Sequence, residues 1–289
     1  MHKISAAIIG AGRIGSFLAS LFKAHKISTE IIIDRNIQKA RCIGEKYRIK
    51  YISDDILTIP NKVNLFCICV EDRFITDVAR KITELRKNFN GSYCFHTSGS
   101  LSSSKLEELK AKGCEVFSFH PNISFVSDEV NYNVSEIVWA IESNSRKAIR
   151  FANKLVRRFN GNSVVLLEQE KEIYHAISVL LSNYSTILFQ IIQKNFSGSI
   201  NLTKSYSGLL KSTLINIEKL GTDMALTGPL IRNDVETIQK NLMALKKSEP
   251  KLTKIYVELG KLALENLIQN KKVEYNSIEP ILRVFKEEV

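Results

Sequence analysis

A glycine-rich segment near the start of the chain has the residue types and spacing of a phosphate-binding turn. Gly10, Gly12 and Gly15 follow an apolar run at residues 4–9, and a helical pattern follows them at once. In such a turn the first glycine allows a sharp bend, the second lets a pyrophosphate approach the backbone, and the third lets the helix pack close to the strand. The helix N-terminus then offers unpaired N–H groups to the phosphates. The spacing predicts dinucleotide binding, with an incidental strand-to-helix turn as the alternative.

An acidic and a basic residue stand side by side at the end of the second predicted strand. Asp34 follows the last glycine of the turn by about 20 residues, the place from which a carboxylate accepts hydrogen bonds from the adenosine ribose. That carboxylate favours NAD because it repels a 2′-phosphate. Arg35 favours NADP instead, because a guanidinium can pair with that phosphate, although it can also stack on adenine. The pair is also compatible with a polar strand end that caps a helix, and the choice between NAD and NADP stays open.

Residues 96–100 read His-Thr-Ser-Gly-Ser and come directly after another predicted strand. In open α/β sheets, ligands bind beyond the carboxyl ends of the strands. We therefore expect Ser98 to bind substrate or the nicotinamide end of the cofactor, and Thr97 to contact the cofactor. The same hydroxyls are good N-caps for the helix that follows, and both roles are compatible.

His120 ends the next strand, directly before Pro121. Because proline ends or borders a strand, this histidine is expected at the strand tip, where side chains reach ligands. A structural role is the alternative, but a second strand-end histidine in one domain strengthens the functional reading of both.

The helical pattern after residue 168 carries a polar stripe. Lys171, His175, Ser178 and Ser182 are spaced four, three and four residues apart, which places them on one helix face. Such a stripe is ordinarily the solvated face of an amphipathic helix. A lysine and a histidine at the junction of two domains also suit proton transfer to a developing alkoxide or amine, with Asn183 beside them.

The elements that must position these residues change in kind along the chain. Up to residue 168, apolar runs typical of strands alternate with helical patterns, which predicts an α/β domain with a doubly wound, mostly parallel sheet. After it, only long helical patterns follow. The sequence therefore predicts a dinucleotide-binding domain at 1–168 and an all-helical substrate and dimerisation domain at 169–289.

Composition restricts the class of protein further. The chain has 289 residues and a net charge of +11, but its lysines alternate with glutamates along predicted helices, so a solvated surface is favoured over nucleic-acid binding. We expect no membrane span, since no apolar run approaches about 20 residues. The five cysteines form no CxxC pair, which favours buried reduced thiols over metal or disulfide. Because the first strand begins almost at the N-terminus, we expect no signal peptide and a cytoplasmic protein.

Taken together, the segments at 10–15, 96–100, 119–121, 171–184 and 227–234 resemble a known family. The chain is similar to a family assigned as NADP oxidoreductases with a C-terminal domain of unknown function. That family is related to ketopantoate reductase, pyrroline-5-carboxylate reductase and the β-hydroxyacid dehydrogenases, and it has no settled substrate. The resemblance implies a Rossmann domain followed by a helical domain like that of 6-phosphogluconate dehydrogenase.

The resemblance also implies roles for single residues. In β-hydroxyacid dehydrogenases a Lys-x-x-x-Asn pair is catalytic; here Lys171 takes the lysine place and His175 stands where the asparagine would be. The turn at Ser98 resembles the substrate-binding Ser-Gly turn of 6-phosphogluconate dehydrogenase, and His120 with its proline resembles the His-Pro of prephenate dehydrogenases. In the similar family the second strand often ends in Ser-Arg, which suits NADP; Asp34 replaces that serine here.

The sequence thus predicts a homodimeric, NADP- or NAD-dependent oxidoreductase that transfers hydride to or from a small anionic carbonyl or imine. The alternative is a dinucleotide-binding regulator without turnover. No metal and no nucleic-acid partner are expected. The predicted catalytic residues are Lys171, His175, Asn183, His120 and Ser98. The predicted cofactor contacts are Gly10, Ala11, Gly12, Arg13, Ile14, Gly15, Asp34, Arg35, Val70 and Thr97.

Overall fold

The computed structural model describes residues 3–126, 133–195, 202–270 and 275–287. Contacts divide the chain into two compact units, Met1–Tyr184 and Ser185–Val289. The first turns of the helix after residue 168 therefore belong, by their contacts, with the sheet. The functional boundary predicted at residue 168 stays a prediction.

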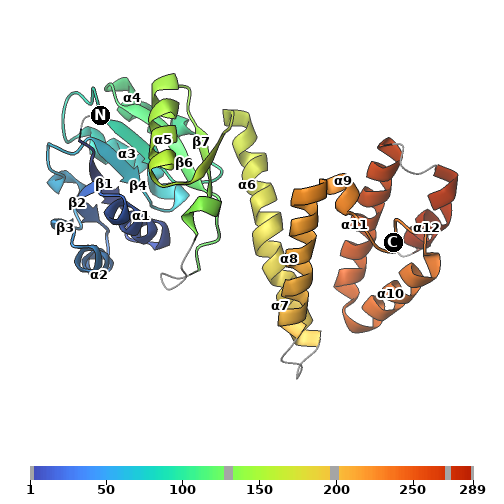
Figure 1. Cartoon of the computed structure of the whole chain (residues 1–289). Coiled ribbons are helices and arrows are strands. Elements are labelled where there is room, and N and C mark those ends of the chain that lie inside the picture. Colours follow the sequence, from blue (N-terminus) through green and yellow to red (C-terminus); the bar gives the residue numbers. More distant parts are fainter. Residues whose placement is uncertain (1–2, 127–132, 196–201, 271–274, 288–289) are drawn as a thin grey trace. The chain divides into compact units, whose positions relative to one another are not determined.

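An eight-stranded sheet forms the centre of the first unit in its described part (Figure 1). The strands are β1 (Ser5–Ile9), β2 (Ser28–Ile33), β3 (Tyr51–Ser53), β4 (Leu65–Ile68), β5 (Tyr93–His96), β6 (Glu115–Pro121), β7 (Val138–Glu142) and β8 (Asn162–Val165). Their spatial order is β3-β2-β1-β4-β5-β6-β7-β8, so the order reverses between β1 and β4. This is the doubly wound arrangement, and the predicted fold class is confirmed.

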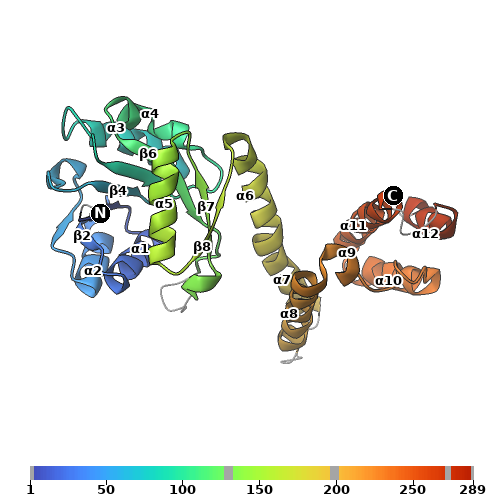
Figure 2. The same ribbon diagram turned by 45° about the horizontal axis from the view of Figure 1, so that its top comes forward.

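Helices cover both faces of the sheet because its strands are apolar on both sides (Figure 2). They are α1 (Arg13–Ala24), α2 (Ile37–Tyr47), α3 (Ile75–Thr83), α4 (Glu107–Ala111) and α5 (Arg146–Arg158). Ala6 and Ile8 of β1 lie in the apolar cluster with α1, α2 and α5, whereas Ala7 and Ile9 lie in the cluster with α3 and α4. The period of two along β1 thus separates two cores, and it holds the loops after the strands at one edge.

The sheet is mostly parallel, as predicted, with one strand that was not predicted and one antiparallel pair. The strand β3 was not predicted, because Tyr51–Ser53 is three residues long and partly exposed, too short to show an alternating pattern. β7 runs antiparallel to β6, with His120 opposite Ala140 and Pro121 opposite Trp139. Pro121 is the last residue of β6 and His120 the one before it, so His120 lies at the tip of the strand, as predicted.

The helical stretch Glu168–Asn195 has the length and mean hydropathy, 1.3, of a candidate membrane span, and none of its most apolar window is buried. It comprises α6 (Lys171–Val179), a π-helix (Leu180–Tyr184) and α7 (Ser185–Asn195). Its first turn carries Lys171, whose ammonium is buried against polar atoms of the sheet domain. By length and composition alone, one such helix is weak evidence of a membrane span.

The described part of the second unit is helical, as predicted. It contains α7 with α8 (Leu202–Leu220), α9 (Thr222–Ala225), α10 (Val235–Ser248), α11 (Pro250–Gln269) and α12 (Tyr275–Glu287). The last three long helices share one apolar core around Phe285, which packs directly on Gly260.

Candidate active site

The glycine turn has the geometry that the three predicted roles require. Gly10 has φ +107°, a conformation that favours glycine, and its N–H donates to the carbonyl of Ile33 at 2.7 Å. A Cβ on Gly12, the N-cap of α1, would meet no atom within 4 Å, so the backbone there is open to a ligand. A Cβ on Gly15 would overlap the carbonyl of Gly10. No side chain caps the α1 N-terminus, which leaves its first N–H groups available to a phosphate.

A pocket of about 700 Å³ opens beside this turn. Five of the predicted cofactor contacts line it: Gly10, Gly12, Asp34, Arg35 and Val70. Among the other predicted contacts, Ala11 is buried behind the turn, and Arg13 donates to the carbonyl of Phe125 at 3.4 Å. The open backbone, the uncapped helix and this pocket together fit the pyrophosphate and adenosine of a dinucleotide.

Asp34 and Arg35 both line this pocket, but their side chains make different contacts. Both carboxylate oxygens of Asp34 already accept backbone hydrogen bonds, from the N–H of Ala11 at 2.7 Å and of Asn36 at 2.8 Å. The guanidinium of Arg35 lies 4.2 Å from the centre of the Phe74 ring, a cation–π contact that holds it flat. Lys39 lines the same pocket. Asp34 thus braces the glycine turn while retaining lone pairs for a ribose, and Arg35 with Lys39 offers positive charge to a phosphate.

The loop after β5 holds its first histidine as a structural residue. His96 is fully buried; its Nε2 donates to the carbonyl of Ser102 at 3.0 Å, and its Nδ1 accepts from the N–H of Ser98 at 3.3 Å. Burial lowers the pKa of His96 to about 4, so the ring is neutral at neutral pH. This histidine shapes the Ser98 turn and leaves no ring nitrogen for a ligand.

Lys171 lies directly against that turn. It is 1% exposed, and its Nζ donates to the carbonyl of Ser98 at 3.1 Å and to the hydroxyl of Ser118. Burial lowers the pKa of Lys171 to about 8, while the carboxylates of Glu142 and Asp72 act in the opposite direction. The structure therefore brings together Lys171 and Ser98, which are 73 residues apart in the sequence.

His120, at the end of β6, lies against the same turn. Its Nδ1 donates to the carbonyl of Thr97 at 3.1 Å, and burial lowers its pKa to about 4. The rings of His120 and His175 are perpendicular, with centroids 5.9 Å apart, and both pack on Gly99. Four of the five predicted catalytic residues thus meet around one turn.

Asn183 is the exception. It lies in the π-helix Leu180–Tyr184 and is exposed, and among the described contacts none joins it to Lys171 or His175. A π-helix adds a residue to the turn, so the regular spacing used to place Ser182 and Asn183 beside the stripe does not hold there. The predicted role of Asn183 has no geometric support within the first unit.

The ordinary amphipathic interpretation of this helix is also wrong. The solvated-face alternative requires an exposed Lys171 and buried apolar residues on the other side. Lys171 is instead buried, and Ile173 and Ile177 are 59% and 47% exposed. The polar face points inward at its first turn, which favours a functional interpretation of the lysine.

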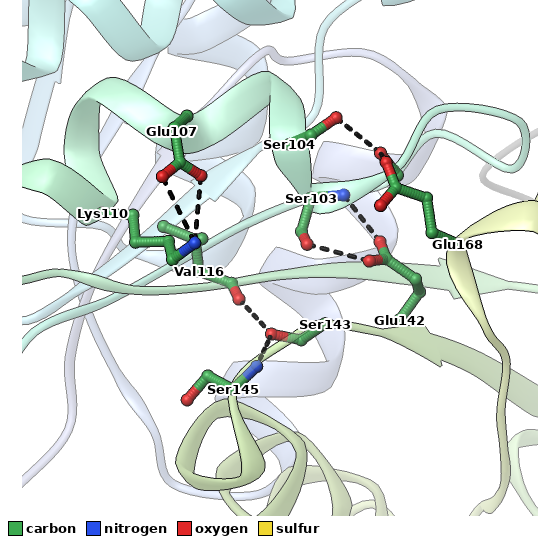
Figure 3. Close-up of polar contacts among 10 residues, drawn as sticks. Ser103, Ser104, Glu107, Lys110, Val116, Glu142, Ser143, Ser145 and Glu168 are labelled. Carbon is green, nitrogen blue, oxygen red and sulfur yellow. Dashed lines mark hydrogen bonds and ion pairs between the residues drawn. The ribbon is translucent and has the colours of Figure 1, made fainter.

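Sequence reasoning missed two carboxylates that hold the site. Asp72, in the short 3₁₀ turn Asp72–Phe74 after β4, accepts from the hydroxyls of Ser98 at 2.8 Å and Ser100 at 3.2 Å. Glu142 of β7 is buried and accepts from the N–H of Ser103 at 2.6 Å and from its hydroxyl at 3.0 Å (Figure 3). These contacts fix both ends of the loop that carries the Ser98 turn.

Ser118 was missed as well, although the sequence holds a signal for it. Ser118 and His120 are two residues apart in β6, so their side chains lie on the same face of the strand. Once His120 was a candidate, this spacing could therefore have added the Ser118 hydroxyl to the predicted site. No spacing rule points to Asp72 or Glu142, because they reach the loop from separate strands.

The segment 227–234, one of those that carry the family resemblance, ends in a helix cap. Asp234 caps α10 by accepting from the N–H of Thr237 at 3.0 Å, and Asn233 donates to the carbonyl of Ser277 at 2.6 Å. Arg232 is 3.9 Å from the Asp234 carboxylate. Within the described residues no cluster of three or more metal-ligating side chains occurs, and all five cysteines, which lie there, are unpaired.

Comparisons with known proteins agree with this architecture. Residues 4–89 match the model of an oxidoreductase family with an NAD-binding Rossmann fold. Residues 137–263 match the model of a domain of unknown function, DUF2520. The resemblance stated from the sequence is therefore confirmed, and the first unit carries an NAD-binding Rossmann domain. No curated protein matches the chain by sequence.

Solved structures share the fold over nearly the whole chain. A protein from Bacteroides fragilis assigned as an NADP oxidoreductase is 20% identical, with 90% of this chain and 97% of that chain covered and a TM-score of 0.69. A protein from Thermotoga maritima is 23% identical, with coverages of 93% and 100% and a TM-score of 0.70. A reductive aminase from Aspergillus terreus, solved with NADPH and ethyl-5-oxohexanoate, is 11% identical, with coverages of 99% and 93% and a TM-score of 0.58.

Proposed function

We propose that this chain, which joins an NAD-binding Rossmann domain of an oxidoreductase family to a DUF2520 domain, reduces a small anionic carbonyl or imine, or catalyses the reverse oxidation. The observation that carries the proposal is the buried ammonium of Lys171 at the edge of the sheet where the cofactor turn lies. The register runs from Ile9 to Ile68, His96 and Ser118 across neighbouring parallel strands. β5 is two strands from β1, about 10 Å away, within the length of a bound dinucleotide.

When bound, the nicotinamide cofactor supplies or accepts the hydride. Lys171 is the proton donor for the reduction. An ammonium has three N–H donors, and the carbonyl of Ser98 and the hydroxyl of Ser118 take two of them. The third donates to the substrate oxygen or nitrogen and passes it the proton as negative charge develops there during reduction.

The surroundings of Lys171 favour an anionic substrate. His96 and His120 are neutral at neutral pH, whereas Lys171 brings positive charge to the site, and the carboxylates of Asp72 and Glu142 are occupied by serine hydroxyl and N–H groups. A substrate carboxylate near Lys171 gains attraction in a buried setting, where charges are weakly screened.

The test is a titration of the purified protein with NADH and with NADPH, followed by turnover on a panel of small 2-oxo acids and cyclic imines. Binding of one cofactor with oxidation of that cofactor by a member of the panel supports the proposal, and the preferred cofactor resolves the opposed signals of Asp34 and Arg35. Binding without any turnover supports a non-catalytic regulator. Binding of neither cofactor removes the basis of both.

We also propose that a second copy of this chain covers α7 and α8, as the sequence predicted for the helical domain. Monomeric proteins rarely expose a large contiguous apolar surface, and two-fold self-association is the commonest way to cover one. Sedimentation should give twice the chain mass of 32.7 kDa, and a Leu214→Lys variant should be monomeric. A monomeric wild-type protein would contradict this arrangement. The exposed side chains are Ile187, Leu188, Leu209, Leu210, Leu214, Ile215 and Leu220.

The pH dependence of turnover should follow Lys171. Because the pKa of this ammonium is lowered to about 8, reductive turnover should fall as pH rises through about 8, where the proton donor is lost. The Asp72 carboxylate raises that pKa, so Asp72→Asn should move the alkaline limb of the kcat profile to lower pH. Glu172→Gln removes a neighbouring exposed carboxylate and should leave the limb in place. An unmoved limb in Asp72→Asn would show that another group titrates.

A further inference from the structure

The tautomers of the histidines around Gly99 can be read from their contacts. The Nδ1 of His120 lies 3.1 Å from the carbonyl of Thr97, which accepts only, so Nδ1 carries the hydrogen. Burial keeps this ring neutral. The Nε2 of His120 is therefore a lone-pair acceptor, and it lies 3.1 Å from the position that a Cβ on Gly99 would take.

His175 has the opposite arrangement. Its Nδ1 is buried, and within the described structure it has no hydrogen-bond partner. It packs against Gly99, where a Cβ would overlap it. An N–H buried without an acceptor costs more than a buried lone pair that meets only C–H groups, so Nδ1 carries no hydrogen and the ring N–H is on Nε2. The residue as a whole is partly exposed, in contrast to its Nδ1.

We propose that His175 contacts the substrate as a hydrogen-bond donor through Nε2–H, beside the acceptor Nε2 of His120. The two rings then recognise different atoms of one small molecule. This inference rests on the proposed function and narrows its substrate to a 2-oxo or 2-imino acid. A carboxylate oxygen accepts from His175, the reacting oxygen or nitrogen accepts from Lys171, and the hydroxyl or amine formed by reduction donates to His120.

The assignment differs from a simple replacement of asparagine by histidine. The amide nitrogen of an asparagine side chain overlies the Nδ1 position of a histidine, whereas that of glutamine overlies Nε2. If His175 acts through Nε2, glutamine preserves the donor and asparagine does not. If it acts through Nδ1, the outcome is reversed. The pair His175→Gln and His175→Asn therefore separates the two geometries, with His175→Leu as the variant that removes both.

The first measurement is a nitrogen–proton correlation spectrum of the imidazoles in the ¹⁵N-labelled protein with NADPH, in which His175 is assigned by its loss in His175→Gln. We expect Nε2 protonated and Nδ1 unprotonated in His175. A proton on Nδ1 would overturn the proposal. This reading requires no turnover, so it stands apart from the test of the proposed function.

The second measurement is a titration with oxalate, a planar probe that carries two carboxylates, in the protein saturated with NADP⁺ or NAD⁺. His175→Gln should bind oxalate within about 3-fold of wild type, whereas the asparagine and leucine variants should bind at least about 10-fold more weakly, as expected for the loss of one hydrogen bond to a charged group. Equal loss in the glutamine and asparagine variants would overturn the Nε2 assignment. No binding of oxalate to wild type would overturn the assigned substrate class, whereas failure of cofactor binding would contradict the proposed function itself.

Discussion

Lys171→Met should abolish most of the turnover while cofactor binding survives. The methionine fills nearly the same volume and removes the buried charge, so the site keeps its shape and loses its proton donor. General acid–base catalysis contributes about 10²–10⁴-fold, and kcat should fall by about that factor. The Kd for NADPH or NADH should stay within about 2-fold of wild type, because the carbonyl of Ser98 and the hydroxyl of Ser118 are the described hydrogen-bond partners of Lys171, and the cofactor pocket does not include it.

The matched control is Lys154→Met, on the exposed face of α5. It makes the same chemical change on the surface and should leave kcat unchanged. Thermal unfolding of both variants separates a lost donor from a lost fold: Lys171→Met should unfold at or above the wild-type temperature, since it removes the cost of burying a charge. Wild-type turnover in Lys171→Met would remove Lys171 from the mechanism.

The glycine turn and the strand-end residues could be predicted from the sequence, whereas the contacts around Lys171 could not. The glycine turn is local: three residues within six positions fix a bend, an open backbone and a close packing, and each of these is visible in the structure at Gly10, Gly12 and Gly15. Strand ends in a parallel sheet meet at one edge, and Ser98 and His120 were both expected at strand ends from local pattern alone. These predictions needed only local pattern and topology.

The rest depended on tertiary contacts that spacing does not encode. The periodicity of α6 correctly placed Lys171 and His175 on one face, but it could not tell which face is buried, and Lys171 rather than Ile173 proved to be inside. The π-helix changes the angular position of Asn183, and no residue type in the sequence predicts a π-helix. Asp72 lies 26 residues from Ser98, and Glu142 39 residues from Ser103, so their hydrogen bonds follow from the assembled sheet alone.

Gly12→Ala should weaken cofactor binding without destabilising the protein. A methyl group on Gly12 meets no protein atom within 4 Å, and its φ of −82° suits any residue, so the fold accommodates it. The methyl group enters the space that we assign to the pyrophosphate. Overpacking of this kind costs about 1–3 kcal/mol, which corresponds to about 5- to 150-fold in the Kd for NADPH or NADH.

Gly15→Ala separates this effect from a general loss of structure. Its methyl group would overlap the carbonyl of Gly10, so the strand and helix must move apart and the unfolding temperature should fall clearly. Gly208→Ala in α8, where a methyl group also meets no atom of the chain within 4 Å, should leave cofactor binding unchanged, because Gly208 does not line the cofactor pocket. The three variants therefore distinguish a ligand-facing glycine from a packing glycine and from a surface glycine. If Gly12→Ala bound the cofactor as tightly as wild type, the pyrophosphate could not approach the backbone there, and the turn would be only the close joint between β1 and α1.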